Sequence, residues 1–169
     1  PAAFSTVHCN YPGQKYPFDD YCGAGVAYTI CRALMQDTMP ELLDLAMIGT
    51  IGDMVKVTGE GHIIVKRGLE ILNQTERPGL RALIKQAGLT MGKITATDVG
   101  FNIAPRLNAV GRLADASLAV ELLLSDDEEQ AEKIAARIEE LNNERKELTS
   151  KVYDDCLAQV EKNGWQHRN

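Results

Sequence analysis

The feature that most constrains the fold is a helical pattern that no glycine or proline interrupts between residues 127 and 162. Apolar side chains recur there in one stripe at heptad-like spacing, at Ile134, Ile138, Leu141, Leu148 and Val152. A helix of about 35 residues is roughly 50 Å long, which is more than a core of this size can cover. Such a rod is either a coiled-coil arm or a strut to another domain. Because Arg145 and Asp155 interrupt the stripe, we favour the strut.

Prolines, glycines and apolar periodicity divide the rest of the chain into shorter elements. They predict helices over residues 23–35, 42–55, 63–73, 79–87 and 117–124, and a short helix, a turn and a second short helix over residues 95–112. Residues 4–9 alternate as a short strand does. Ser125 and Glu128 have the spacing of a capping box, so Ser125 is expected to cap the long helix. We therefore expect a mostly α-helical chain with a short N-terminal strand and a long C-terminal helix.

The composition is that of a folded domain, with 169 residues of which 44% are hydrophobic and 25% charged. No apolar run approaches the roughly 20 residues of a membrane helix, so we expect no membrane span. The four cysteines form no Cys-x-x-Cys pair, which argues against a zinc site and is typical of a reducing cytoplasm. The first residues, Pro-Ala-Ala-Phe, have no signal-peptide pattern and suggest a piece of a longer protein.

Positive charge is concentrated in one part of a chain whose formal net charge is −6. Residues 77–112 contain six lysines and arginines and a single acidic residue, Asp98, whereas the segments on either side are acidic. A local excess of positive charge is what binding of a polyanion requires. The alternative is that these cations lie on solvated helix faces.

Asp53 is the only charged residue between residues 45 and 55, a run that is otherwise almost wholly apolar. Burying a charge costs several kcal/mol unless a cation, a metal or hydrogen bonds compensate it. Asp53 is therefore a candidate metal ligand or buried ion-pair partner. The alternative is an exposed aspartate at a helix end, or a cap for the next segment, and the residues alone leave both open.

Arg106, Asn108 and Arg112 form a second candidate site within seven residues. A guanidinium offers forked donors that match phosphate oxygens, and an asparagine adds a hydrogen bond to a backbone or a base. The alternative is a network of salt bridges from these arginines to Asp98 and Asp115. No complete catalytic triad, P-loop or dinucleotide-binding motif accompanies either candidate site.

Two segments, DLAMIGTIGDMVKVTGEG and TATDVGFNIAPRLNAVGRLADASLAVELL, resemble the RecJ single-stranded-DNA-specific exonucleases of the DHH phosphoesterase superfamily. The stretch YPFDDYCGAGVAYTICRALM is similar to the segment that follows the DHH motif in that family. The resemblance covers nearly the whole chain, and PRLNAVGRL is its most specific part. Gly52 stands where the family usually has alanine.

This resemblance implies a bacterial enzyme that degrades single-stranded DNA from the 5′ end in recombination and repair, with Mn²⁺ or Mg²⁺ as cofactor. In that family, aspartates and a histidine from several motifs bind a pair of metal ions. Asp53 matches the aspartate of the fourth motif, so the resemblance makes it a catalytic residue and a metal ligand. It also implies that Arg106, Asn108 and Arg112 face the DNA, and that one of the arginines holds the 5′ phosphate.

The resemblance further implies a division of the chain. Residues 1–124 would be the helical C-terminal part of an α/β DHH catalytic domain, residues 125–163 the connecting helix, and residues 164–169 the start of a truncated DHHA1 domain. The other catalytic motifs would precede Pro1, so we expect the isolated chain to be inactive. The exposed rod makes self-association of this chain plausible.

Two other functions stay open. Within the same superfamily, the alternative is a phosphodiesterase of oligoribonucleotides or cyclic dinucleotides. From another class, the alternative is a non-catalytic helical module that binds a protein, because a long helix with an interrupted apolar stripe also suits a partner surface. A pocket long enough for several nucleotides would favour the nuclease.

Overall fold

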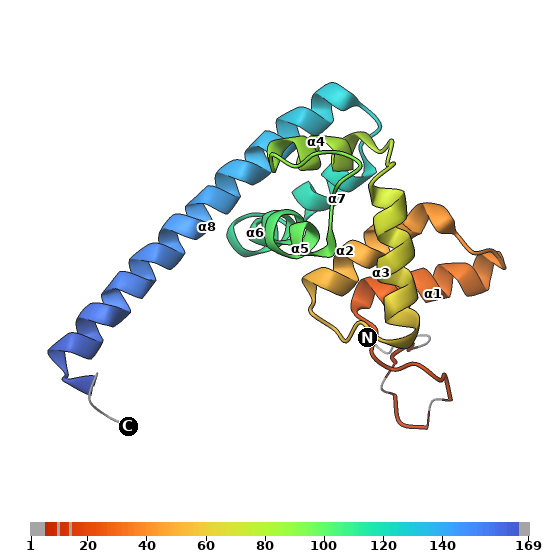
Figure 1. Ribbon diagram of the computed structural model, residues 1–169, viewed down its shortest axis with the longest axis horizontal. Helices are drawn as coiled ribbons and strands as arrows, with labels where there is room; N and C mark the ends of the chain where they lie inside the picture. The colour runs from red at the N-terminus through yellow and green to blue at the C-terminus, as the bar shows by residue number, and fades with distance from the viewer. Residues whose placement is uncertain (1–5, 10, 14, 166–169) are drawn as a thin grey trace.

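The computed structural model describes residues 6–9, 11–13 and 15–165, and within them every regular element is a helix (Figure 1). The predicted mostly α-helical fold is confirmed. The α-helices are α1 (Gly23–Met35), α2 (Leu43–Gly52), α3 (Gly59–Leu72), α4 (Pro78–Gln86), α5 (Ala96–Asp98), α6 (Ala104–Leu113), α7 (Ser117–Leu124) and α8 (Glu128–Lys162). A 3₁₀ turn, η1 (Pro40–Leu42), precedes α2, and a π-helical turn, η2 (Val99–Ile103), joins α5 to α6.

Several details of the sequence prediction differ from the structure. The helix expected over residues 42–55 ends at Gly52, and the one expected over residues 63–73 begins at Gly59. Residues 6–9 form no strand, and the remainder of the strand expected over residues 4–9 lies outside the described residues. The turn expected within residues 95–112 is also absent, because α5, η2 and α6 follow one another without a break. Gly100, which favoured a turn, instead lies in η2, where a Cβ would come 3.4 Å from Cγ2 of Ile51. Close packing against α2 therefore keeps this glycine within a helical turn.

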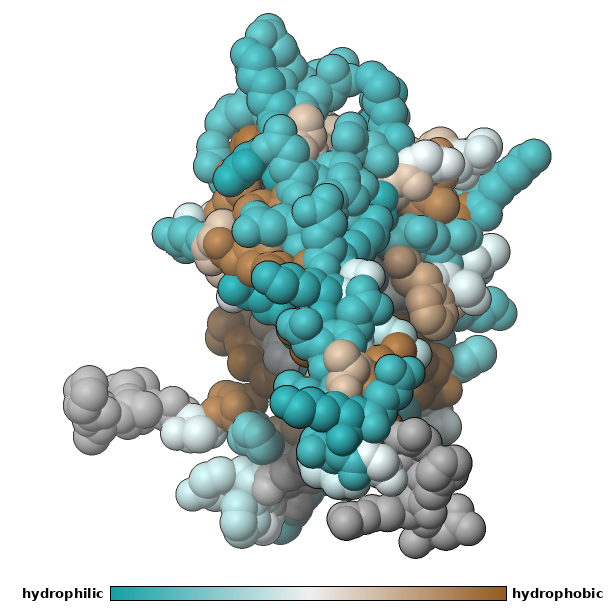
Figure 2. All heavy atoms as spheres, turned by 90° about the vertical axis from the view of Figure 1, so that its left-hand side faces the viewer, coloured by the Kyte–Doolittle hydropathy of each residue, from teal (hydrophilic) through white to brown (hydrophobic). Residues whose placement is uncertain are grey.

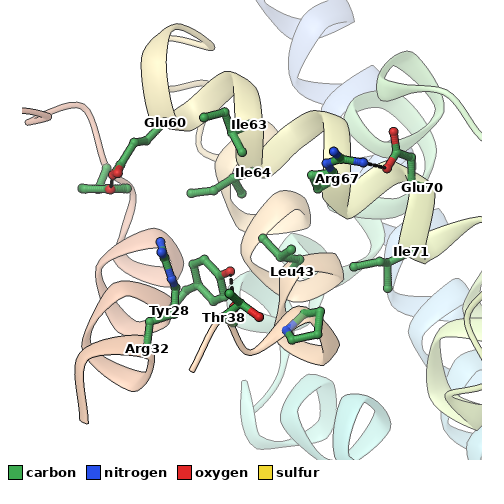
Figure 3. Close-up of a pocket in the computed structure, with 12 residues that line it drawn as sticks. Tyr28, Arg32, Thr38, Leu43, Glu60, Ile63, Ile64, Arg67, Glu70 and Ile71 are labelled. Carbon is green, nitrogen blue, oxygen red and sulfur yellow. Dashed lines mark hydrogen bonds and ion pairs between the residues drawn. The ribbon is translucent and has the colours of Figure 1, made fainter. Parts of the chain in front are cut away.

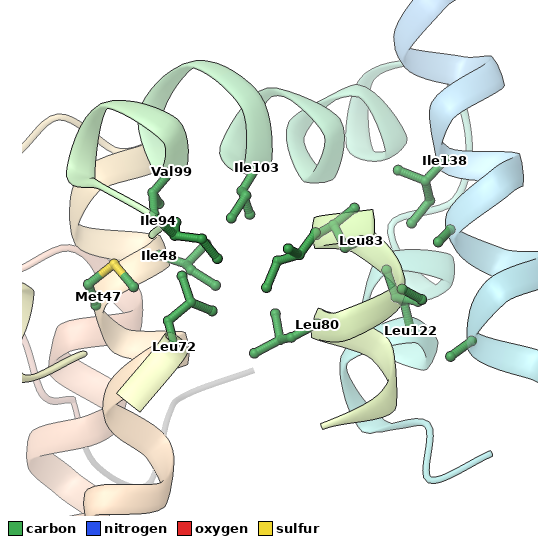
Figure 4. Packing of buried hydrophobic residues seen from close by; sticks show 14 of the residues in the cluster. Met47, Ile48, Leu72, Leu80, Leu83, Ile94, Val99, Ile103, Leu122 and Ile138 are labelled. Carbon is green, nitrogen blue, oxygen red and sulfur yellow. The ribbon is translucent and has the colours of Figure 1, made fainter. Parts of the chain in front are cut away.

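The helices enclose one hydrophobic core (Figure 4). At one end of this core α2 packs between α1 and α3, and at the other end α4, α6 and α7 pack against α8. The wholly buried side chains come from all of these layers except α1, and include Met47, Leu72, Leu80, Leu83, Ile103, Leu122 and Ile138. The core thus joins segments that are nearly one hundred residues apart in the sequence.

The long helix α8 begins and ends almost where its sequence predicts. Asp127, not Ser125, is its N-cap, since the Asp127 carboxylate accepts the N–H of Gln130 at 3.0 Å. The Ser125 hydroxyl accepts the N–H of Asp127 instead, so the predicted cap is wrong by two residues. Serine and aspartate are both favoured at the N-cap position, and the charge of the aspartate is stabilised further by the positive end of the helix dipole.

Only the N-terminal half of α8 is packed against the rest of the molecule. Its buried residues end at Asn142, while Leu148 and Val152 of the same apolar stripe are exposed. The C-terminal half extends away from the other helices in Figure 1. The face of the molecule that α8 forms is mainly hydrophilic, with scattered apolar residues (Figure 2). Among the described residues, no helix combines the length and the apolar character that crossing a bilayer requires.

Gly68 fixes the crossing of α2 and α3. A Cβ at Gly68 would clash with Cβ of Met47 and lie 2.5 Å from the carbonyl oxygen of Leu43. The two helices can therefore approach this closely only because the residue has no side chain.

We expect Gly68→Ala to lower the free energy of unfolding by about 2–3 kcal/mol, because the added methyl group must push α3 away from α2. Urea denaturation measures this. The matched control is Gly111→Ala in α6, where a Cβ meets nothing within 4 Å, and where alanine should raise stability by roughly 0.5–1 kcal/mol through helix propensity. Equal stability of the two variants would contradict the proposed crossing.

Candidate functional site

Three helices converge on an open pocket of about 820 Å³. The wall consists of the N-terminal end of α1, one face of α2 with the residues that follow it, and one face of α6, and Leu123 of α7 completes it. The pocket brings together Asp53, Asn108 and Arg112, which the sequence analysis had assigned to two separate candidate sites. Most of the remaining wall is apolar, so the pocket has few polar groups and these are concentrated in two helices.

Small residues allow the three helices to meet. A Cβ at Gly49 would lie 2.5 Å from Cβ of Ala24, so α1 and α2 nearly touch. A Cβ at Gly52 would lie 3.2 Å from Cβ of Ala104, so α2 and α6 are also close. An alanine at position 52 would require Ala104 to move by a few tenths of an ångström. Backbone proximity, rather than long side chains, thus shapes the pocket.

Asp53 directly follows α2 as its C-cap. Its backbone N–H donates to the carbonyl oxygen of Gly49 at 3.0 Å, and its side chain is exposed at the pocket. Asp53 is therefore an exposed aspartate at a helix end and not a buried ion-pair partner. Its expected role as a metal ligand stays a prediction. No described residue donates a hydrogen bond to this carboxylate, so its oxygens are available to a ligand. Met54, the next residue, has a left-handed backbone with φ of 55°, which turns the chain sharply away from α2.

Asn108 and Arg112 are four residues apart on α6 and therefore lie on one face of it. Both are exposed, and both line the pocket. Among the described residues, none forms a hydrogen bond with the side chain of Asn108 or Arg112, and Arg112 makes no ion pair. Arg112 thus supplies a free guanidinium, and Asn108 a free amide, to the pocket that Asp53 also lines.

Arg106 is oriented away from this pocket, towards α8. Its side chain is buried, with 8% of its surface exposed. Nε donates to Oε2 of Glu139 at 2.5 Å, Nη2 donates to Oε1 at 3.1 Å, and Nη1 donates to the carbonyl oxygen of Asn102 at 2.6 Å. The fork of the guanidinium is therefore occupied by a carboxylate of the long helix, and the structure does not bring Arg106 together with the other three candidates.

The salt-bridge partners suggested by the sequence bind elsewhere. Asp98 accepts the hydroxyl and the N–H of Thr95 in a capping box, and these hydrogen bonds hold the pKa of Asp98 below its usual value. Asp115 accepts the N–H of Ser117, which lowers the pKa of Asp115 likewise. Sequence reasoning missed Glu139 because it lies 33 residues from Arg106, and only its place on the packed side of the α8 stripe distinguishes it from the other glutamates.

A second pocket, of about 530 Å³, lies between α1, η1 and α3 (Figure 3). Most of its charged groups are engaged, including Glu60, which accepts a hydrogen bond from the Tyr16 hydroxyl at 3.0 Å. Arg67 pairs with Glu70 at 2.8 Å, and the guanidinium of Arg32 lies 5.6 Å from the centroid of the Tyr28 ring. The Tyr28 hydroxyl donates to the carbonyl oxygen of Thr38 at 2.7 Å. The exception is Arg32, whose Nε is buried without a hydrogen-bond partner among the described residues. Both carboxylates of this pocket, those of Glu60 and Glu70, are engaged, so it has no counterpart of the free Asp53 carboxylate.

The first pocket offers a single carboxylate to a divalent cation, that of Asp53. Nowhere in the described part of the chain do three histidine, cysteine, aspartate or glutamate side chains gather closely enough to hold a metal ion. The residues present therefore fit one ligand of a metal centre and not a complete one.

Sequence comparison relates the chain to nucleases specific for single-stranded DNA. It is 46% identical over 164 residues to the RecJ exonuclease of Bacillus subtilis. This alignment covers 97% of the chain and 21% of the Bacillus protein. The chain is 33% identical over 178 residues to the RecJ exonuclease of Escherichia coli. This alignment covers 96% of the chain and 31% of the Escherichia protein. No family model matches the chain.

Structural comparison gives the same relationship. The RecJ structure from Thermus thermophilus in complex with Mg²⁺ superposes with a TM-score of 0.79 at 34% identity, over 86% of this chain and 24% of that one. A structure of RecJ bound to manganese has a TM-score of 0.79 at 34% identity, over 89% of this chain and 38% of that one. The resemblance to RecJ is thereby confirmed for one helical segment of these proteins. The chain spans between a fifth and a third of the length of the curated relatives named above.

We expect Glu139→Gln to lower the free energy of unfolding by about 3 kcal/mol, because it leaves the buried Arg106 charge without its partner. The control is Glu140→Gln on the same helix. Glu140 pairs with Arg137 at 2.6 Å on an exposed face, and loss of such a pair costs no more than about 0.5 kcal/mol. Thermal and urea unfolding compare the two. If Glu139→Gln were as mild as its control, Arg106 would not depend on this pair.

Proposed function

We propose that this chain is part of a metal-dependent exonuclease that degrades single-stranded DNA from the 5′ end in the cytoplasm, in recombination and repair. The observation that carries the proposal is the convergence of Asp53 with Asn108 and Arg112 in one pocket, in a segment similar to RecJ. A free carboxylate and a free guanidinium in one pocket suit a substrate that brings phosphate and a divalent cation together.

Within this proposal, residues 1–124 are the helical C-terminal part of a DHH catalytic domain and residues 125–163 connect it to a DHHA1 domain that begins at residues 164–169. The N-terminal half of α8 packs against the other helices and its C-terminal half is exposed, as expected of a helix that connects two domains. The chain alone would be inactive, because its described residues supply one metal ligand where a two-metal site needs several.

Asp53 would hold Mn²⁺ or Mg²⁺ together with ligands from other parts of the full-length protein. When bound, such a pair of ions activates a water molecule and stabilises the charge that develops on the displaced phosphate. Asp53 is suited to this role because its carboxylate has no partner within the described chain. Its position at the end of a rigid helix would also fix its direction.

Arg112 and Asn108 would hold the DNA backbone beside this centre. Arg112 offers two N–H groups to a phosphate, and Asn108, one turn earlier, offers an amide to the same strand. We propose that Arg106 acts differently from these two, as the residue that joins α6 to α8 through Glu139, because its donors are already occupied.

A second candidate function rests on the exposed stripe at Leu148 and Val152. These residues are unpartnered within the described chain, so the C-terminal half of α8 would serve as a protein-binding or self-associating surface in the isolated chain. An exposed apolar stripe on α8 does not contradict the nuclease function, because in the full-length protein another part of the same chain can cover it.

In the full-length protein, we expect Asp53→Asn to lower the turnover of 5′-phosphorylated single-stranded DNA by about 100-fold or more, because loss of a ligand removes several kcal/mol of charge stabilisation. The fold should be unchanged, since the side chain is exposed. The control, Asp126→Asn, changes an exposed aspartate before α8 and should keep full turnover. Unchanged turnover of folded Asp53→Asn protein would remove Asp53 from the metal centre.

Arg112→Ala should weaken binding of single-stranded DNA and lower the slope of log affinity against log salt concentration by about 0.7, the value for one phosphate contact. The measurement is fluorescence anisotropy of a labelled oligonucleotide over a range of salt concentrations, with metal chelated. Lys66→Ala is the charge-matched control, because Lys66 is exposed on α3 outside the pocket. Equal losses for both variants would mean that only overall charge matters.

A further inference from the structure

Phe101 is an exposed aromatic residue inside a rigid part of the fold. Its side chain is 79% exposed, although its neighbours Val99 and Ile103 on the same turn are wholly buried. These neighbours belong to the hydrophobic core (Figure 4), so the backbone on either side of Phe101 is held in place. The exposure of the ring is therefore a feature of the packed structure and not of a loose end.

The ring lies on the same face of the helical segment as the candidate phosphate-binding residues. Phe101 precedes Asn108 by seven residues, or two turns, and Arg112 by eleven, or three turns of about 3.67 residues each. The wider π-helical turn η2 contributes to this spacing. The burial pattern supports a shared face. Phe101, Asn108 and Arg112 are exposed, while Arg106 and Ala109, on the other side of α6, are buried.

Two close contacts set this segment beside the end of α2. A Cβ at Gly100 would lie 3.4 Å from Cγ2 of Ile51, and a Cβ at Gly52 would lie 3.2 Å from Cβ of Ala104. The turn that carries Phe101 is therefore adjacent to the helix end that carries Asp53. One surface thus presents an aromatic ring, a free amide, a free guanidinium and a free carboxylate.

The chemistry of this surface points to one kind of occupant. A single aromatic ring beside polar and cationic groups is poorly suited to a protein–protein interface, which is marked by a contiguous apolar patch. It suits a single-stranded nucleic acid, whose bases stack on aromatic rings while its phosphates bind cations. The positive charge of this surface comes from Arg112, because four of the six cationic residues between 77 and 112 (Arg77, Arg81, Lys85 and Arg106) form ion pairs with carboxylates of other segments.

We propose that Phe101 is a stacking platform for a base of the single strand whose backbone is held by Asn108 and Arg112. This inference rests on the proposed function, and it adds that the site recognises bases as well as phosphates. Stacking is tolerant of sequence, because every base has a π-face. The strand would then run along the exposed face of η2 and α6, with Phe101 at one end and Arg112 at the other.

The test uses the full-length protein, with metal chelated so that the strand stays intact. The probes are a 5′-phosphorylated oligothymidylate and an abasic oligomer of equal length, which has the phosphates but no bases. Phe101→Ala should weaken binding of the oligothymidylate by about tenfold, leave binding of the abasic oligomer unchanged, and leave the salt slope unchanged. Leu34→Ala is the control, since Leu34 is 77% exposed on α1, and should bind both probes as the parent protein does.

Phe101→Trp supplies an independent readout. It should retain affinity for the oligothymidylate, and the added indole fluorescence, taken as the difference from the parent protein, should be quenched by this probe and not by the abasic oligomer. Thermal unfolding of both Phe101 variants should match that of the parent, because the side chain is exposed.

The outcomes separate this inference from the function on which it rests. If Arg112→Ala weakens binding but Phe101→Ala does not, the strand binds this site without stacking on Phe101 and the inference is wrong. If Phe101→Ala weakens binding of both probes equally, its role is structural and the inference is again wrong. If neither variant changes binding, the proposed DNA site itself fails.

Discussion

The guanidinium of Arg106 and the carboxylate of Glu139 form a forked pair between α6 and α8, and the arrangement of the molecule depends on it. Both groups lose most of their hydration, so the pair persists because its geometry is good and because Asn102 accepts a further hydrogen bond from the same guanidinium. A buried pair of this kind tolerates little displacement of either partner. The long helix is thereby held at a defined place against the helix that carries Asn108 and Arg112.

The pocket depends on a second constraint, which is the absence of side chains. Gly49 and Gly52 lie one turn apart on α2 and face Ala24 of α1 and Ala104 of α6 respectively. Because these contacts are made almost backbone to backbone, the three helix segments meet closely enough for groups at their ends to share one pocket. The carboxylate of Asp53 and the donors of α6 are therefore placed by packing, and no direct bond between them is needed.

Periodicity and helix breakers predicted the helices well, because α1 and α7 have the predicted bounds and α8 is close to them. Two of the errors arose where a residue type favours two structures. Ser125 is a good cap, but Asp127 is the better one at the positive end of a helix. Gly100 is common in turns, but here it permits close packing against Ile51. Local patterns do not distinguish these cases, since the deciding contacts come from elsewhere in the chain.

The sequence by itself determined the helical class, the long rod and the residue types able to bind a cation or a phosphate. It did so because these properties follow from local spacing and side-chain chemistry. The tertiary structure alone decided that Asp53, Asn108 and Arg112 share a pocket, that Arg106 turns towards Glu139, and that the ring of Phe101 is exposed. Residues four apart on a helix share a face whatever surrounds them, but whether that face meets a carboxylate, a core or solvent depends on helix packing.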